Sequence, residues 1–83
     1  MLKSQDVFDR LAQGWGSTLV ARHEVARFSG GVLHPRTMAN VDSLGLGPDG
    51  MIRIGKKVAY DKALLVEWMR GRSKSSMSEI QGA

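Results

Sequence analysis

The stretch from Ser29 to Gly45 most constrains what this 83-residue chain can fold into. Gly30-Gly31 predicts a reversal of the chain, because glycine reaches backbone conformations that other residues avoid. Pro35 suits the first position of a helix, where its missing N–H is not needed. Gly45 is typical of the residue that follows a helix. We therefore expect a turn and then one short helix that begins at Pro35.

The expected helix has an apolar and a polar side. Met38 and Val41, with Leu44 at the end of the stripe, recur at a spacing that places them inward. His34 precedes the helix as a weak cap. The opposite, polar side carries Arg36, Thr37, Asn40 and Ser43. These four residues are the first candidates for contact with a partner.

A β-hairpin is expected next, over residues 51–60. Its apolar residues alternate with others, as in strands that are buried on one side. Four of them meet on the buried side if Ile54 opposes Val58 and Ile52 opposes Tyr60. The sequence therefore predicts this register.

The register decides the tip of the hairpin. It leaves Gly55-Lys56-Lys57 as a three-residue loop, which is a common hairpin length. A two-residue loop would instead set Ile54 opposite Lys57, which the apolar pattern disfavours. We therefore expect both lysines at the end of a rigid ribbon.

Helices are expected on both sides of this central part. One runs from Arg22 to Phe28 after the short apolar pair Leu19-Val20, and another runs from Asp61 or Lys62 to Arg70. Trp68 is expected to be the core anchor of the last helix. Residues 6–13 predict a short amphipathic helix that either packs on the domain or pairs with a second copy of the chain. We divide the chain into an N-terminal segment (1–17), one domain (18–72) and a tail (73–83) that is expected to be disordered.

The net charge of +4 falls within residues 22–72, because the two flanking segments are each balanced. A basic domain is what phosphate binding requires, although a merely basic surface explains the charge equally well. The chain has no cysteine, which excludes disulfides and thiolate metal sites and fits a cytoplasmic protein. It also lacks a signal-peptide core and any apolar run near about 18 residues, so we expect no membrane span.

Enzyme chemistry is not expected. His23 and His34 are the two histidines, and no cysteine or suitable carboxylate pattern accompanies them, so no metal site is predicted. No nucleophile stands with a base and an orienting group, and no nucleotide-binding glycine pattern is present. We expect no catalytic residue, no cofactor, no metal and no small-molecule substrate.

Two helices joined by a turn, then a hairpin and a helix, follow the plan of a winged helix-turn-helix. The runs RHEVARFSGG, HPRTMANVDSLGLGP and IRIGKKVAYDKALLVEWM resemble the small excisionase-like, MerR-like helix-turn-helix proteins of phages and mobile elements. The resemblance covers roughly residues 19–70. Three departures are a longer turn over residues 29–33, Val41 where an aromatic residue is common, and Asp42 where a basic one is common. The expected fold is mainly α with a small β-hairpin.

The resemblance implies sequence-specific binding of double-stranded DNA, as an excisionase that assists an integrase or recombinase, or as a small transcription regulator at the bacterial nucleoid. A helix fits the major groove, where Arg pairs with guanine and Asn with adenine. The expected base-contacting residues are Arg36, Thr37, Asn40 and Ser43. The expected contacts to the DNA backbone or minor groove are Arg22, His34, Arg53, Lys56 and Lys57.

Two partner questions stay open at this point. A small chain reads few base pairs, so a second copy of itself is an expected partner. The alternative function is a protein-interaction module whose basic face docks an acidic protein. Phe8 and Trp15 would then be the exposed contact surface.

Overall fold

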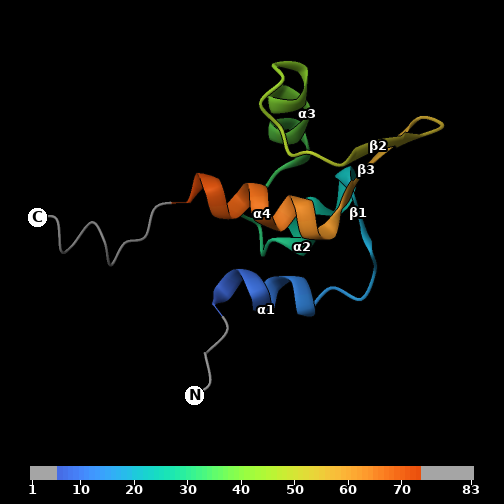
Figure 1. Cartoon of the computed structure of the whole chain (residues 1–83). Coiled ribbons are helices and arrows are strands. Elements are labelled where there is room, and N and C mark those ends of the chain that lie inside the picture. Colours follow the sequence, from blue (N-terminus) through green and yellow to red (C-terminus); the bar gives the residue numbers. More distant parts are fainter. Residues whose placement is uncertain (1–5, 74–83) are drawn as a thin grey trace, which may run out of the picture.

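The structure is a computed structural model that describes residues 6–73. Its elements are α1 (Val7–Gln13), β1 (Leu19–Ala21), the 3-10 turn η1 (Arg22–Glu24), α2 (Val25–Phe28), α3 (Pro35–Ser43), β2 (Met51–Ile54), β3 (Lys57–Asp61) and α4 (Lys62–Arg72). Figure 1 shows α1, α2 and α4 stacked in the body, with α3 standing at one end and the β2–β3 hairpin projecting from the side. The described chain therefore has four α-helices and a small antiparallel sheet. None of these helices has the length and apolar character needed to cross a membrane.

The sheet has one strand more than the sequence indicates. Its order is β1-β3-β2, and both pairings are antiparallel. The apolar pair Leu19-Val20 predicts only a lead-in to a helix, but Leu19 pairs with Asp61 and Val20 with Tyr60. Three residues are too few for a recognisable alternation, so this long-range pairing could not be read locally.

The core lies between the sheet and the helices. Its fully buried side chains are Val20, Val25, Met38, Tyr60 and Leu65. Trp68 is half-buried and packs against this core from outside, while its Nε1 donates to the Leu46 carbonyl at 2.9 Å. Trp68 therefore ties the loop after α3 to α4, in addition to its predicted packing role.

Helix α1 packs on the body, which is the first of the two possibilities for the N-terminal segment. Phe8 and Leu11 lie against the core, and Trp15 meets the Phe28 ring edge-on at 5.3 Å. Arg70 of α4 holds the start of α1 by ion pairs with Asp6 and Asp9. The hydrogen bond from the Asp9 amide, and secondarily Arg70, hold the pKa of Asp6 below its usual value.

The turn between α2 and α3 follows the prediction. Gly30 and Gly31 adopt φ angles of 67° and 90°, which reverse the chain. The buried Ser29 hydroxyl donates to the Val25 carbonyl at 2.6 Å and accepts from the Leu33 amide at 2.8 Å. This side chain closes a turn that is longer than usual. The disorder expected over 73–83 lies outside the described residues except at Ser73, whose amide donates to the Arg70 carbonyl at 3.3 Å.

Two details of the α3 prediction are wrong. Helix α3 begins at Pro35 and buries Met38 as expected, but the His34 side chain makes no cap hydrogen bond. Leu44 is 69% exposed instead of facing inward. The reason is that Leu44 is already the cap residue and Gly45, with φ of 75°, turns the chain away from the helical path.

The predicted hairpin register is wrong by one residue. Ile54 opposes Lys57 and Ile52 opposes Ala59, which leaves the two-residue loop Gly55-Lys56. Gly55 has φ of 61°, and a glycine at the first position suits the tight two-residue turn that matches the twist of the strands. Turn chemistry thus prevails over apolar pairing. Ile54 is 59% exposed as a result, and Lys57 belongs to β3 instead of the tip.

Candidate nucleic-acid interface

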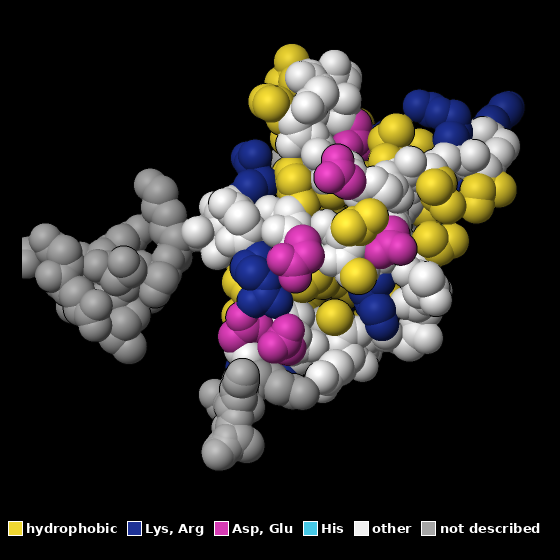
Figure 2. Space-filling view, viewed as in Figure 1, with side chains coloured by type: hydrophobic (Ala, Val, Ile, Leu, Met, Phe, Trp, Pro, Cys, Tyr) yellow, Lys and Arg dark blue, Asp and Glu magenta, His cyan; other side chains and the backbone are white. Residues whose placement is uncertain are grey.

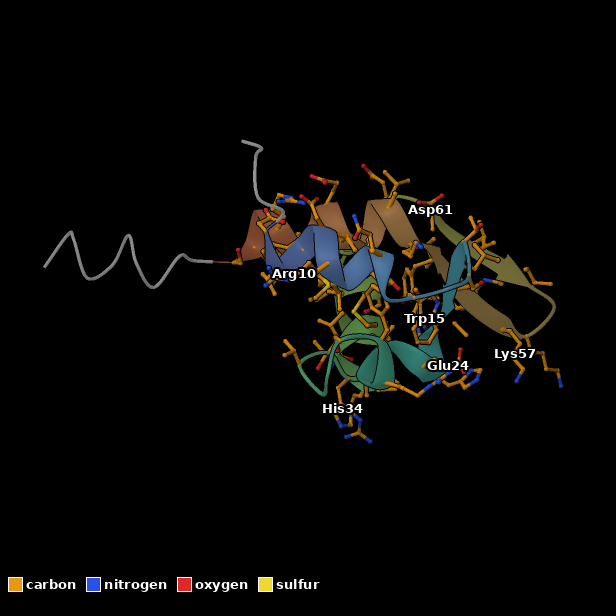
Figure 3. All side chains as sticks on the ribbon, turned by 90° about the horizontal axis from the view of Figure 1, so that it is seen from below. Arg10, Trp15, Glu24, His34, Lys57 and Asp61 are labelled. Carbon is orange, nitrogen blue, oxygen red and sulfur yellow. The ribbon has the colours of Figure 1, made fainter. Side chains whose placement is uncertain are left out.

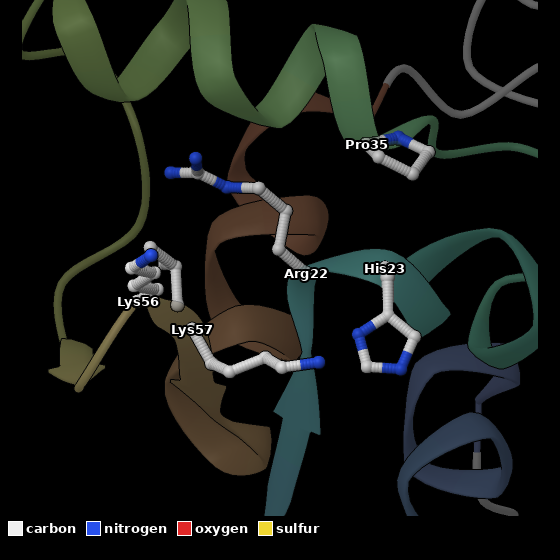
Figure 4. Close-up of a pocket in the computed structure, with 6 residues that line it drawn as sticks. Arg22, His23, Pro35, Lys56 and Lys57 are labelled. Carbon is white, nitrogen blue, oxygen red and sulfur yellow. The ribbon is translucent and has the colours of Figure 1, made fainter.

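A groove of about 380 Å³ joins the start of α3 to the hairpin. Its lining, hereafter the basic groove, consists of Arg22, His23, Pro35, Lys56, Lys57 and Val58. Figure 4 shows Lys57 extending from the hairpin in the direction of His23, with Pro35 at the start of α3 on the far side. The 3-10 turn η1 lies between these two pieces and packs against both α3 and β3. Segments far apart in the sequence therefore share one basic surface.

The cations of the hairpin are free to meet a partner. Arg53, Lys56 and Lys57 are exposed, and none of them forms an ion pair within residues 6–73. Arg53 opposes Val58 across the hairpin, so the two residues share the face on which the basic groove opens. The hairpin therefore carries unpaired positive charge beside the groove.

The polar side of α3 is exposed along its length. Arg36, Thr37 and Asn40 all face solvent. Ser43 is exposed as well, and its hydroxyl donates to the Asn40 carbonyl at 2.9 Å. Arg36 and Asn40 are one turn apart on a helix that stands at the edge of the body (Figure 1). The structure thus places Arg36, Asn40 and Ser43 on one accessible helix surface, whereas Thr37, although exposed, borders a second groove lined by Val7, Phe8 and Trp68.

His34 lies just before this surface. It is exposed, and Figure 3 shows it projecting from the lower side of the molecule as drawn, as does Lys57. His23 is exposed in the basic groove itself. Within residues 6–73 no three histidines, aspartates or glutamates come together in a way that would hold a metal ion.

Arg22 occupies a different place from the one the sequence suggests. Its Nε donates to the Tyr60 hydroxyl at 3.0 Å and its Nη2 donates to Asp42 Oδ2 at 2.6 Å. The Tyr60 hydroxyl also donates to Asp42 Oδ2, at 2.6 Å. Arg22, Asp42 and Tyr60 are called the Arg22 network below. The guanidinium expected on a phosphate is therefore used within the fold.

The network keeps its charges in place. Burial, and then the hydrogen bond with Asp42, raise the pKa of Tyr60 to about 12. Burial lowers the pKa of Arg22, but its hydrogen bonds with Tyr60 and Asp42 outweigh that effect and raise the pKa above its usual value. Asp42, an acidic residue on α3, has its side chain only 9% exposed and turned away from the polar side. Its charge is thus compensated inside the molecule.

Sequence reasoning missed this network because its members are far apart along the chain. Asp42 and Tyr60 lie 20 and 38 positions from Arg22, and no local pattern links them. One local signal was available, which is the acidic residue Asp42 on the expected helix. A carboxylate that the fold buries needs a cation beside it, and Arg22 supplies that cation.

A second, apolar groove of about 520 Å³ lies beside the C-terminal end of α4. Its lining, hereafter the apolar groove, includes Val7, Phe8, Leu11, Val32, Leu33, Trp68 and Met69. The contact surface expected for a protein partner is therefore wrong in part. Phe8 is half-buried and borders this groove, but Trp15 packs on Phe28 with the Arg27 guanidinium 4.9 Å from its ring.

The surface colours show how charge is distributed around these features. In Figure 2 some Lys and Arg side chains lie at the end of the hairpin beside hydrophobic side chains, and others lie on the body next to Asp and Glu side chains. Comparison with known proteins finds no family model and no curated protein that matches this chain.

Proposed function

We propose that the chain binds double-stranded DNA as a winged helix-turn-helix module. Helix α3 lies in the major groove, and the β2–β3 hairpin lies on the backbone or in the minor groove as the wing. The observation that carries the proposal is the basic groove, because Lys56 and Lys57 of the hairpin and Pro35 at the start of α3 line it together. A DNA ligand needs both pieces on the same side of the protein.

The charges of the hairpin suit the phosphate backbone. Lys56 and Lys57 border the groove and Arg53 lies behind them, all exposed and without an acidic partner within residues 6–73. Each phosphate that such a cation neutralises releases counterions, which makes binding strong at low salt and weak at high salt. Arg22 is left out of this set, because its Nε and Nη2 donate to Tyr60 and Asp42 and its charge is paired with Asp42.

Helix α3 provides the sequence preference. Arg36 can form two hydrogen bonds with guanine and Asn40 can form two with adenine, and each such pair discriminates by about 1–3 kcal/mol. Thr37 serves a phosphate or a thymine methyl group, and Ser43 lies one turn further along. The role as an excisionase or a small transcription regulator, with a recombinase or a second copy as partner, rests on the family resemblance alone.

The test begins with selection of preferred duplexes from a random pool, followed by fluorescence anisotropy at two salt concentrations. Lys56→Ala should weaken binding of all sequences alike and lower the salt slope by about 0.9. Asn40→Ala should relax the preference at one position by about 1–3 kcal/mol. Arg72→Ala is the control for the hairpin charge, since it removes one positive charge at the end of α4, away from the hairpin (Figure 1); Arg72 stacks on Trp68 and borders the groove that contains Thr37, so this control applies to Lys56 and not to Thr37. Binding that is absent, or insensitive to salt, refutes the proposal.

A second candidate function is supported by the apolar groove. A protein partner with an acidic surface would bind the basic groove and place an apolar side chain in the apolar groove. Val7 is 59% exposed and borders the apolar groove from α1, so Val7→Ser should weaken capture of such a partner without adding a charge beside α3, and should leave DNA affinity unchanged. If Val7→Ser and wild type behave alike in every binding assay, this second function is excluded.

A further inference from the structure

Side chains from four elements meet at the Arg22 guanidinium. Arg22 itself belongs to η1, Asp42 to α3, Tyr60 to β3 and Met51, whose Sδ lies 3.9 Å from Nη2, to β2. We propose that Arg22 is a positioning residue that fixes the orientation of α3 relative to the hairpin. This role rests on the proposed function, because the orientation of α3 relative to the hairpin decides whether both can contact the same DNA duplex.

The geometry of the network suits this role. A guanidinium is planar, so two acceptors bonded to Nε and Nη2 are held in a fixed relation to each other. One acceptor here stands on α3 and the other on the hairpin. Tyr60 is fully buried, so the hydroxyl that meets Asp42 comes from a residue that the core holds still. The tie therefore joins α3 to a rigid support.

The loop between α3 and β2 adds a second restraint on Asp42. A Cβ atom at Gly47 would lie only 1.9 Å from Asp42 Oδ1, so the carboxylate packs closely against the loop at a position that only glycine leaves open. Asp42 therefore lies between Arg22 and Tyr60 on one side and Gly47 on the other. This packing adds to the restraint that the hydrogen bonds place on α3.

Two substitutions separate this role from simple charge. Arg22→Lys keeps the positive charge but loses the planar fork, and Tyr60→Phe keeps the buried ring but loses the hydroxyl. In wild type, Lys56 and Lys57 should each contribute about 0.9 to the salt slope. If the wing loses its orientation, both contributions vanish, so the loss of affinity between about 50 and about 200 mM salt becomes about 12-fold smaller. In the Arg22→Lys or the Tyr60→Phe background, Lys56→Ala should then change the DNA affinity less than twofold, because Lys56 no longer contacts a phosphate there.

A measurement without DNA tests the orientation itself. The sequence has no cysteine, so Leu44→Cys and Ile54→Cys provide unique attachment sites for spin labels, the first at the cap that ends α3 and the second on the hairpin. Both positions are exposed, at 69% and 59%. The distance distribution between the labels should be narrow in the wild-type background and should broaden with Arg22→Lys or Tyr60→Phe.

The control is a variant that lowers stability elsewhere. Asp61→Ala removes the cap hydrogen bond from the Leu64 amide, 3.0 Å long, and leaves the network untouched. All variants are compared below their melting temperatures. Equal broadening with Asp61→Ala, or an unchanged salt slope and distance distribution with Arg22→Lys and Tyr60→Phe, overturns the positioning role. If wild type fails to bind duplex DNA while the distances broaden as expected, the DNA proposal falls and the orientation role stands.

Discussion

The replacement of Gly47 by alanine tests the packing around Asp42. The new Cβ would lie 1.9 Å from Oδ1 of Asp42, a distance that real Cβ atoms do not show, and 3.0 Å from Cγ, which is a tight contact. The carboxylate must therefore leave its place, and its hydrogen bonds with Arg22 and Tyr60 are lost with it. Each hydrogen bond to a charged group contributes about 1.5–3 kcal/mol.

The expected loss is smaller than the sum of these two bonds. The Arg22 side chain is 24% exposed, so water replaces part of what Asp42 supplied. Alanine also stiffens the unfolded chain, which returns about 0.4–1 kcal/mol. We expect a net loss of about 2 kcal/mol of unfolding free energy, and a melting temperature lower by about 8–16 °C for a domain of this size. Thermal unfolding followed by circular dichroism measures it.

Two further variants make the result specific to Asp42. Gly16→Ala is the matched control, because a Cβ at Gly16 would meet nothing within 4 Å. In the background of Asp42→Ala, the Gly47→Ala substitution should cost nothing more, since the atom it displaces is gone. If Gly47→Ala melts together with Gly16→Ala, or costs the same with Asp42 removed, the account of this contact is refuted.

Two predictions concern Tyr60 and the hairpin. The pKa of Tyr60 is about 12 in the folded chain and about 10 in the unfolded one, so the folded state holds its proton more tightly. Stability from this group is complete below about pH 10 and is lost between about pH 10 and 12; urea unfolding should show a fall of about 2 kcal/mol that is absent in Tyr60→Phe. Gly55→Ala should cost about 1–2 kcal/mol in urea unfolding, because its φ of 61° is unfavourable for a side chain. If the urea midpoint of Gly55→Ala equals that of wild type, the result supports the three-residue loop instead.

The sequence predicted those parts of the fold that depend on the backbone preferences of individual residues. The proline at the start of α3 restricts its own backbone angles, and the glycine pair before it allows angles that other residues avoid. These effects do not depend on contacts with the rest of the chain. The hairpin was predicted from the alternation of its apolar residues. Its register was not, because apolar alternation and turn geometry favoured different pairings, and the glycine of the loop decided between them.

The sequence did not predict the features that depend on contacts between residues far apart along the chain. Strand β1 exists because β3 offers it an edge, and three residues carry no such information. For the candidate site, the exposure of Arg36 and Asn40 followed from helical spacing, and the exposure of Lys56 from the hairpin. The function assigned to Arg22 did not follow, because its acceptors become neighbours only after folding.

The outward isoleucines of β2 have a practical consequence for work with this protein. Ile52 and Ile54 stand on the last strand of the sheet, which pairs with β3 on one side alone. An exposed apolar edge of this kind is a template for aggregation, and the cation of Arg53 between the two acts as a gatekeeper. At high concentration the chain will therefore stay in solution better with threonine at position 54, and will precipitate more readily once Arg53 is neutralised.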